Sequence, residues 1–396
     1  MHAIPRGFKF AGVHAGIKRN PQKEDVTLIV ADGPAVAAGV YTQNLVFAAP
    51  VALDRSRTPS GRIRCVVVNS GNANACTGER GLDDAYEMAR MAADTCGASA
   101  EDALVMSTGI IGEFLPMEKI AAGIKAAAQR LGSDEEAFLA AARGILTTDK
   151  GVKAVSRTFN FGGQEVRFAG MAKGAGMIGP RMATLLGVLI TDAKLTVEDA
   201  QASLNDAIAD SFNCISVEGH MSTNDTVLLL ASGAATKEPI QGADLAAFQA
   251  ALKETAIELA KMIPDDGEGA THLMVIDVVG AKTREDALRV ARTIADSALV
   301  KTAIHGGDPN WGRIVSAAGY AGVQFNPAGV DLHVNGHRLY WQGAPVKFDA
   351  ATVSQSMQDH RETHIELSLA EGDAKVRFWS SDLTVEYVKF NADYHT

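Results

Sequence analysis

The chain lacks the features that mark secreted, membrane-spanning or metal-stapled proteins. It has only four cysteines in 396 residues, and no two of them form a CxxC pair or stand with a histidine at zinc-finger spacing. Reduced thiols in a cytoplasmic protein are the simplest interpretation. No apolar run approaches the ~18 residues of a membrane span, and the N-terminus lacks the apolar core of a signal peptide. We therefore expect a cytoplasmic protein that makes no membrane contact.

Positive charge is also scarce. Lys and Arg number 37 against 47 Asp and Glu, which gives a formal net charge of −10. Nucleic acids and anionic membranes require a clustered positive field, so neither is an expected partner, although a small basic pocket for a small anion stays open. The hydrophobic content of 47% is that of a globular protein. The length predicts about two to three domains.

Helical and strand patterns alternate along most of the chain. Helices are indicated by a capping box at 133–136 and by Thr-x-x-acid segments at Thr196 and Thr283. Ala-rich periodic runs predict helices at 82–95, 117–131 and 243–263, the last of them stopped by Pro264. Short runs rich in Val, Ile and Leu predict strands at 25–31, 64–69, 165–170, 185–191, 226–231 and 273–279.

The pattern becomes richer in strands after about Gly319. Asn335–Gly336 is a hairpin-turn signal between two short alternating runs. Further alternating runs predict strands at 365–369, 375–379 and 384–390. Helices mixed with strands, and antiparallel pairs near the end, predict a layered α+β fold with helices on both faces of the sheets.

The most unusual segment is the glycine-rich stretch from Lys173 to Thr184. Its glycines fit G-x-G-x-x-G, but that fingerprint must open a helix, whereas the residues after Thr184 read as a buried strand. A dinucleotide loop is therefore disfavoured. A second interpretation is a bent approach to a residue held at the start of the strand, because glycine tolerates strained backbone. Thr184, preceded by the small Ala183, would be that residue.

Thr184 could act as a nucleophile if the chain were cut before it. A threonine hydroxyl is a poor nucleophile unless an adjacent base takes its proton. Cleavage of the Ala183–Thr184 bond would create an α-amino group with a pKa of about 7.7–8.0 beside that hydroxyl, which suits a base at neutral pH. An uncut threonine that begins a strand is the commoner alternative.

Three other segments have residues that could bind a ligand or take part in catalysis. The Thr108–Gly109 step either directs a hydroxyl and a backbone N–H at one point, as an oxyanion hole requires, or is an ordinary turn. The Asn-rich segment 69–76 either binds polar groups or satisfies its own turns. The segment 265–271 lacks the alternate ligands of a calcium loop, and no histidine pair has either zincin order. No metal site is predicted.

Eight segments, taken in order, give the sequence a specific resemblance. It resembles the ornithine acetyltransferases of arginine biosynthesis, also called glutamate N-acetyltransferases, from Gly7 to Thr396. The segments that match are 69–78, 107–112, 147–149, 173–180 with 182–184, 222–226, 266–271, 307–313 and 391–396.

The resemblance implies a chain that cuts itself. Cleavage between Ala183 and Thr184 would leave an α chain of residues 1–183 and a β chain of residues 184–396, assembled as two α and two β chains. The implied fold is a layered αββα arrangement similar to N-terminal-nucleophile hydrolases but differently connected, with a second, smaller α/β region.

The resemblance also implies roles for individual residues. Thr184 would be the nucleophile and, through its free amine, the base, while Thr108 and Gly109 would stabilise the oxyanion. The substrate-binding residues implied are Thr147, Lys173, Thr184, Glu268, Asn391 and Thr396. Lys173 would attract a substrate carboxylate and Glu268 an ammonium group. Arg181 and Gly179 depart from the common family pattern, in which Asn and Ala stand there, and His220 is atypical.

The implied reaction moves the acetyl group of N2-acetylornithine to L-glutamate through an acetyl ester on Thr184. No cofactor is expected, and acetyl-CoA is left open as a second acetyl donor. Three rivals remain: a related self-cleaving aminopeptidase or amidase with water as acceptor, an uncut metabolite-binding protein, and a dinucleotide oxidoreductase.

Overall fold

The computed structural model describes residues 2–161, 163–179 and 185–393. Four residues discussed above, Arg181, Ala183, Thr184 and Thr396, lie outside these ranges. Among the described residues, the helices are all either too short or too polar to cross a membrane.

The first region of the molecule is built on one eight-stranded sheet. Its strand order is β4-β3-β2-β9-β7-β6-β5, with β1 added beside β2. The elements are β1 (Phe8–Val13), β2 (Val26–Tyr41), α1 (Ala49–Arg57), β3 (Ser60–Asn72), α2 (Gly78–Asp94), β4 (Ala103–Ile110), α3 (Met117–Ala128), α4 (Glu135–Gly144), β5 (Lys153–Phe161), β6 (Gln164–Lys173), β7 (Leu186–Thr191), α5 (Val197–Ala209), β9 (Thr226–Ala231) and α6 (Gly242–Asp265).

The long strand β2 serves both halves of this sheet. Its first part, 26–30, pairs with β1 and β3, and its second part, 36–41, pairs with β9. Helices α1, α2 and α3 pack on the first half, and α5 and α6 pack on the second. The other face of the sheet is buried on both halves. Of the described helices, only the ten-residue α4 packs on that face. The two halves therefore cover each other, which gives the α-β-β-α layering that we expected.

A second, smaller region carries a seven-stranded mixed sheet of order β13-β12-β11-β14-β10-β15-β8. Its central strand, β10, runs parallel to β14 and antiparallel to β15, and α7 packs on β10 and β15. The elements are β8 (Ile215–Ser216), β10 (Leu273–Ala281), α7 (Arg284–Asp296), α8 (Ala298–His305), α9 (Trp311–Gly319), β11 (Asp331–Val334), β12 (His337–Trp341), β13 (Ala344–Pro345), α10 (Ala350–Gln358), β14 (Glu362–Ser368), β15 (Ala374–Ser381) and α11 (Val385–Asp393).

Most of the expected elements are present. Thr196 and Thr283 cap their helices by accepting hydrogen bonds from the backbone N–H groups three residues later. The hairpin turn at Asn335–Gly336 joins β11 to β12. The layered α+β fold and the smaller α/β region are confirmed.

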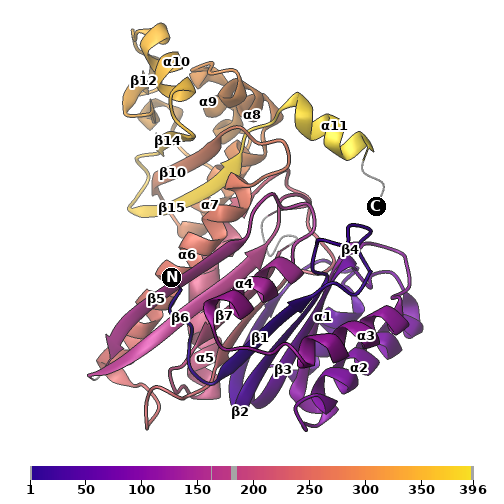
Figure 1. Ribbon diagram of the computed structural model, residues 1–396. Coiled ribbons are helices and arrows are strands. Elements are labelled where there is room, and N and C mark those ends of the chain that lie inside the picture. The colour runs from indigo at the N-terminus through magenta and orange to yellow at the C-terminus, as the bar shows by residue number, and fades with distance from the viewer. Residues whose placement is uncertain (1, 162, 180–184, 394–396) are drawn as a thin grey trace.

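Three local predictions are wrong. The cap of α4 is Asp134, whose carboxylate accepts from the Ala137 N–H, and not Ser133. Pro264 does not stop α6, which continues to Asp265. The predicted strand at 384–390 is the helix α11. Figure 1 shows α11 leaving the smaller region toward the end of the larger one where β4 lies.

Candidate active site

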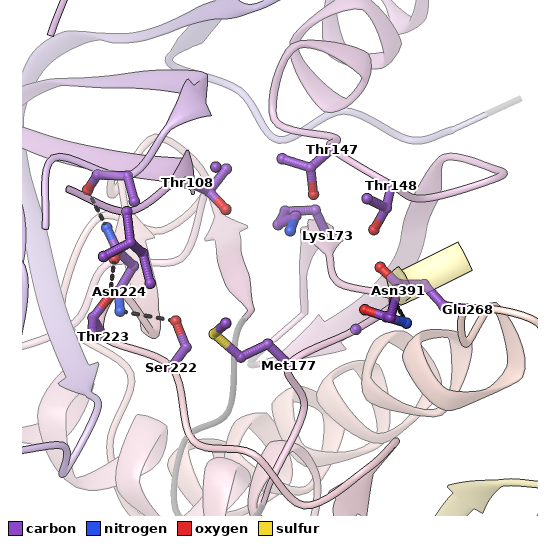
Figure 2. Close-up of a pocket in the computed structure, with 14 residues that line it drawn as sticks. Thr108, Thr147, Thr148, Lys173, Met177, Ser222, Thr223, Asn224, Glu268 and Asn391 are labelled. Atoms are coloured by element: carbon purple, nitrogen blue, oxygen red, sulfur yellow. Dashed lines mark hydrogen bonds between the residues drawn. The ribbon is translucent and has the colours of Figure 1, made fainter. Parts of the chain in front are cut away.

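A pocket lies where the end of β4, the end of β6, the segment before β9 and the helix α11 come together (Figure 2). Six of the residues predicted for the site line this pocket, namely Thr108, Gly109, Thr147, Lys173, Glu268 and Asn391. The remaining predicted site residues, Ala183, Thr184 and Thr396, lie outside the described part of the chain.

Thr108 and Gly109 occupy a distorted strand end and not a turn. The parallel pairing of β4 with β3 slips here, so that Thr108 lies opposite both Ser70 and Asn72. Such a slip kinks a strand and redirects its side chains. Gly109 has φ +134°, and a Cβ on it would stand 2.2 Å from the carbonyl carbon of Gly71. Only glycine fits at this position, so the kink depends on it.

The Asn-rich segment uses its amides to hold backbone. The amide nitrogen of Asn69 donates to the Asn72 carbonyl (2.8 Å), that of Asn72 to the Phe114 carbonyl (3.1 Å), and that of Asn74 to the Gly81 carbonyl (2.8 Å). The sequence left open whether these amides bind a ligand or satisfy nearby backbone groups, and the three hydrogen bonds show that they satisfy backbone groups.

Lys173 places a buried positive charge at the pocket. It ends β6 and is 2% exposed. Burial lowers the pKa of Lys173, and the nearby carboxylate of Asp149 opposes that effect. Asp149 accepts hydrogen bonds from the Lys153 ammonium and the Gly174 N–H, each at 2.7 Å. Burial would raise the pKa of Asp149, but the Lys173 and Lys153 ammonium groups hold it well below its usual range. Asp149 is thus an anion that opposes the loss of charge on Lys173.

Glu268 and Asn391 join the glycine-rich segment to the last helix. The amide nitrogen of Asn391 donates to Glu268 Oε2 at 3.0 Å, and the Glu268 N–H donates to the Ala175 carbonyl at 2.8 Å. A Cβ on Gly176 would stand 2.4 Å from Glu268 Oε2, so a larger residue at 176 would displace the carboxylate. A negative charge therefore stands on the same pocket as the Lys173 cation.

Ser222, Thr223 and Asn224 also line the pocket (Figure 2). In the sequence they belong to the matching segment 222–226, but they have no predicted role there. The amide nitrogen of Asn224 donates to the carbonyls of Ala73 (2.6 Å) and Ser107 (2.8 Å), and so fixes the residue before Thr108. The available signal was a run of polar residues directly before the buried strand β9. Such runs also occur in ordinary loops, and only the hydrogen bond from Asn224 to Ser107 shows that this one meets β4.

One group of side chains outside the pocket has the composition of a metal site. Ligand atoms of His272, His305 and Asp382 lie within 4.8 Å of one another. The hydroxyl of Thr271 donates to Asp382 and lies 3.0 Å from the Nδ1 atom of each histidine. These hydrogen bonds explain why the two histidines and Asp382 lie close together without a metal ion.

Comparison with known proteins shows the family of the chain. The sequence model of the ArgJ family matches residues 9–396. This chain belongs to the ArgJ family. An arginine biosynthesis bifunctional protein ArgJ from Rhodopirellula baltica is 50% identical to it, over 100% of this chain and 97% of the relative. The ArgJ protein of Symbiobacterium thermophilum is 46% identical, over 99% of this chain and 98% of its own.

A solved ArgJ structure is also similar. The crystal structure of the arginine biosynthesis bifunctional protein ArgJ from Bacillus halodurans is 38% identical, with a TM-score of 0.50, and covers 51% of this chain and 96% of that chain. The family resemblance drawn from the eight sequence segments is confirmed, and all of them except 307–313 include a residue that lines the pocket.

Proposed function

We propose that this ArgJ-family chain is an acetyltransferase of arginine biosynthesis that moves the acetyl group of N2-acetylornithine to L-glutamate. The observation that carries the proposal is the convergence of Thr108, Gly109, Thr147, Lys173, Glu268 and Asn391 on one pocket. These residues come from segments far apart in the sequence, and they supply the hydroxyl, the backbone N–H and both signs of charge that acyl transfer between amino acids requires.

The chemistry we propose is a two-step transfer through Thr184. Its hydroxyl oxygen bonds to the acetyl carbon, its α-amine takes the hydroxyl proton, and the C–N bond of acetylornithine breaks as that proton passes to the leaving nitrogen. The amine of glutamate then attacks the ester and restores the hydroxyl. The Thr108 hydroxyl and the Gly109 N–H would stabilise the negative oxygen in both steps.

The charges at the pocket suit both substrates. Each substrate carries an α-carboxylate that the buried Lys173 ammonium attracts. The Glu268 carboxylate, held by Asn391, suits an ammonium group of ornithine. Because Lys173 is buried, its attraction for a carboxylate is screened less by salt than that of a surface lysine.

Self-cleavage before Thr184 is part of the proposal. The Bacillus halodurans chain aligns over 96% of its own length but only 51% of this chain, so it is about half as long. That is the length expected of one product of a chain cut near its middle. We further propose that the two products assemble as two α and two β chains in the cytoplasm. No cofactor is required, and the word bifunctional in the relatives' names supports acetyl-CoA as a second acetyl donor.

Mass spectrometry of the purified protein under denaturing conditions tests the cleavage. We expect two chains, the second of which begins at Thr184. The Thr184→Ala variant should remain one uncut, inactive chain, and Thr184→Ser should cut more slowly. A wild-type protein that stays at full length and is inactive would point to a metabolite-binding protein instead.

The acceptor is tested by incubation with acetylornithine in the presence and absence of glutamate. We expect ornithine release to depend on glutamate and to match the N-acetylglutamate formed. Ornithine release that proceeds equally well without glutamate would identify a hydrolase, with water as the acceptor.

A further inference from the structure

Asp225 is buried against Leu185, the residue that follows the predicted nucleophile in the chain. It is the last residue before β9 and is fully buried. Its Oδ1 atom accepts a hydrogen bond from the backbone N–H of Leu185 at 3.1 Å, and the Leu185 carbonyl accepts from the Thr226 N–H at 3.1 Å. The backbone of Leu185 is thus held on both sides, once by a side chain and once by a strand.

The covalent chain extends this hold to Thr184. The nitrogen of Leu185 is bonded to the carbonyl carbon of Thr184 over about 1.33 Å, across a planar peptide unit. An acceptor on the Leu185 N–H therefore acts on the peptide group that links Leu185 to the residue before it. β7 begins only at Leu186, so the backbone of Leu185 relies on the Asp225 carboxyl for its N–H and on the Thr226 N–H for its carbonyl.

The carboxyl of Asp225 is not explained by packing or by an ion pair. By distance and angle, its Oδ2 atom has no hydrogen-bond partner among the described residues, although the hydroxyls of Thr42 and Ser222 stand close enough to lower its pKa. Burial raises the pKa of Asp225 well above its usual range, although the Leu185 N–H, the Thr42 and Ser222 hydroxyls and the Lys173 charge all oppose that effect. An apolar side chain would be cheaper to bury than this one.

We propose that Asp225 is a positioning residue for the site, which holds the backbone of Leu185, the residue that follows the proposed nucleophile Thr184 in the chain. The inference rests on the proposed function, because it assigns Asp225 a purpose in self-cleavage and in acetyl transfer. What the site requires from Asp225 is an acceptor at Oδ1 and not a negative charge. Asparagine, which has the same shape and retains that oxygen, should therefore replace it.

The test compares Asp225→Ala and Asp225→Asn with a matched control. Asp54 is also fully buried, accepts a strand N–H (Val105, 2.8 Å) through Oδ1 and has an Oδ2 atom without a partner, but it lies against the middle of β4. Asp54→Ala thus removes an equivalent carboxyl away from Leu185. The measurements are the cleaved fraction, the thermal midpoint, kcat and KM for acetylornithine, and the pH profile of kcat/KM.

We expect Asp225→Ala to lower kcat about 100-fold, the scale of a misplaced reacting group, with KM changed less than about threefold. Asp225→Asn should recover kcat to within about fivefold of wild type, with the wild-type pH profile. Asp54→Ala should lower the thermal midpoint as much as Asp225→Ala but leave kcat of the folded, cleaved protein within about threefold.

Two results would overturn the inference. One is equal kcat for the folded Asp225→Ala and Asp54→Ala proteins. The other is a stable Asp225→Asn protein whose kcat is lowered about 100-fold. This second result overturns the inference even if the alanine variant does not fold. A wild-type chain that neither cuts itself nor transfers acetyl overturns the proposed function and the inference together. A working wild type with either result above overturns the inference alone.

Discussion

At the scale of the residue, the pocket depends on two neighbours at the end of β4. Their identities were accessible from the sequence, because a Thr–Gly step suits an oxyanion hole. Their geometry was not, since the slip of β4 against β3 involves Gly71 and Asn72, thirty-seven positions away, and no local pattern announces it. The same holds for Lys173, whose burial depends on Asp149 and Lys153.

Thr108→Ala should reduce turnover and not binding. The charge on the acetyl oxygen develops only in the transition state, so loss of one donor should lower kcat about 100- to 1,000-fold and change KM little. Steady-state kinetics with acetylornithine and glutamate measures both. Thr255→Ala is the control, because it removes a buried hydroxyl that donates to Ala251 in α6. A Thr108→Ala enzyme with the kcat of the control would remove Thr108 from the oxyanion hole.

Gly109→Ala should damage the fold as well as the reaction. The added methyl group would stand 2.2 Å from the Gly71 carbonyl carbon and 2.4 Å from the Asn72 nitrogen, at a φ of +134°. We expect a loss of roughly 3 kcal/mol of stability or more, measured by denaturant unfolding. Gly112→Ala is the control, since Gly112 also has a positive φ (+87°) but nothing within 4 Å of the added methyl. Equal losses in the two variants would contradict the crowding argument.

At the scale of the element, the sequence predicted where strands lie more accurately than where they begin and end. It also predicted a strand where the last helix, α11, forms. The residues 384–390 alternate in polarity, but α11 forms there with no buried residue of its own. Its start is set by Thr384, whose hydroxyl donates to the Gly269 carbonyl (2.8 Å) and accepts from the Tyr387 N–H (3.2 Å). The Thr-capping signal used for α5 and α7 was present here too, but it lacked the acidic residue three positions later.

Thr384→Val should weaken substrate binding through α11. Loss of a helix-capping hydroxyl costs about 1 kcal/mol, and α11 carries Asn391 to Glu268. We therefore expect KM for acetylornithine to rise about fivefold with a smaller change in kcat. Amide exchange in 385–393 should become faster. Thr302→Val, which removes an exposed hydroxyl bonded to its own helix, serves as control, and a KM as low as that of the control would argue against the role of α11.

At the scale of the whole molecule, the sequence predicted the layers of helices and sheets. It did not predict which residues of the larger and the smaller region contact each other. Alternating helices and strands indicated layers, whereas no local pattern showed that one apolar cluster runs through both regions or that α6 packs on β8 and β15. Backbone bonds also join the regions. Val217 and Gly219, next to β8, both donate to the Ile178 carbonyl in the glycine-rich segment. Glu218 lies between them and accepts the Ile178 N–H at 2.7 Å. The smaller region therefore binds the glycine-rich segment at Ile178, although that segment follows β6 of the larger region.

Glu218 should make the stability of this junction depend on pH. Burial raises the pKa of Glu218 to about 8, and the Glu268 carboxylate adds to the effect while Lys301 opposes it. Between the ordinary glutamate pKa and about 8, the folded state keeps a proton that the unfolded state has lost. The Glu218 contribution to stability therefore falls as pH rises through this window, by about 1.4 kcal/mol for each pKa unit.

Glu218→Gln removes the titrating group but leaves an oxygen for the Ile178 N–H, so its thermal midpoint should rise relative to wild type as pH goes from 5 to 9. Scanning calorimetry across that range measures the difference. Glu79→Gln, an exposed substitution in α2, should leave the difference near zero at every pH. A constant offset between Glu218→Gln and wild type would mean that the carboxyl is ionised throughout, and that the two regions meet around a charge and not around a neutral acid.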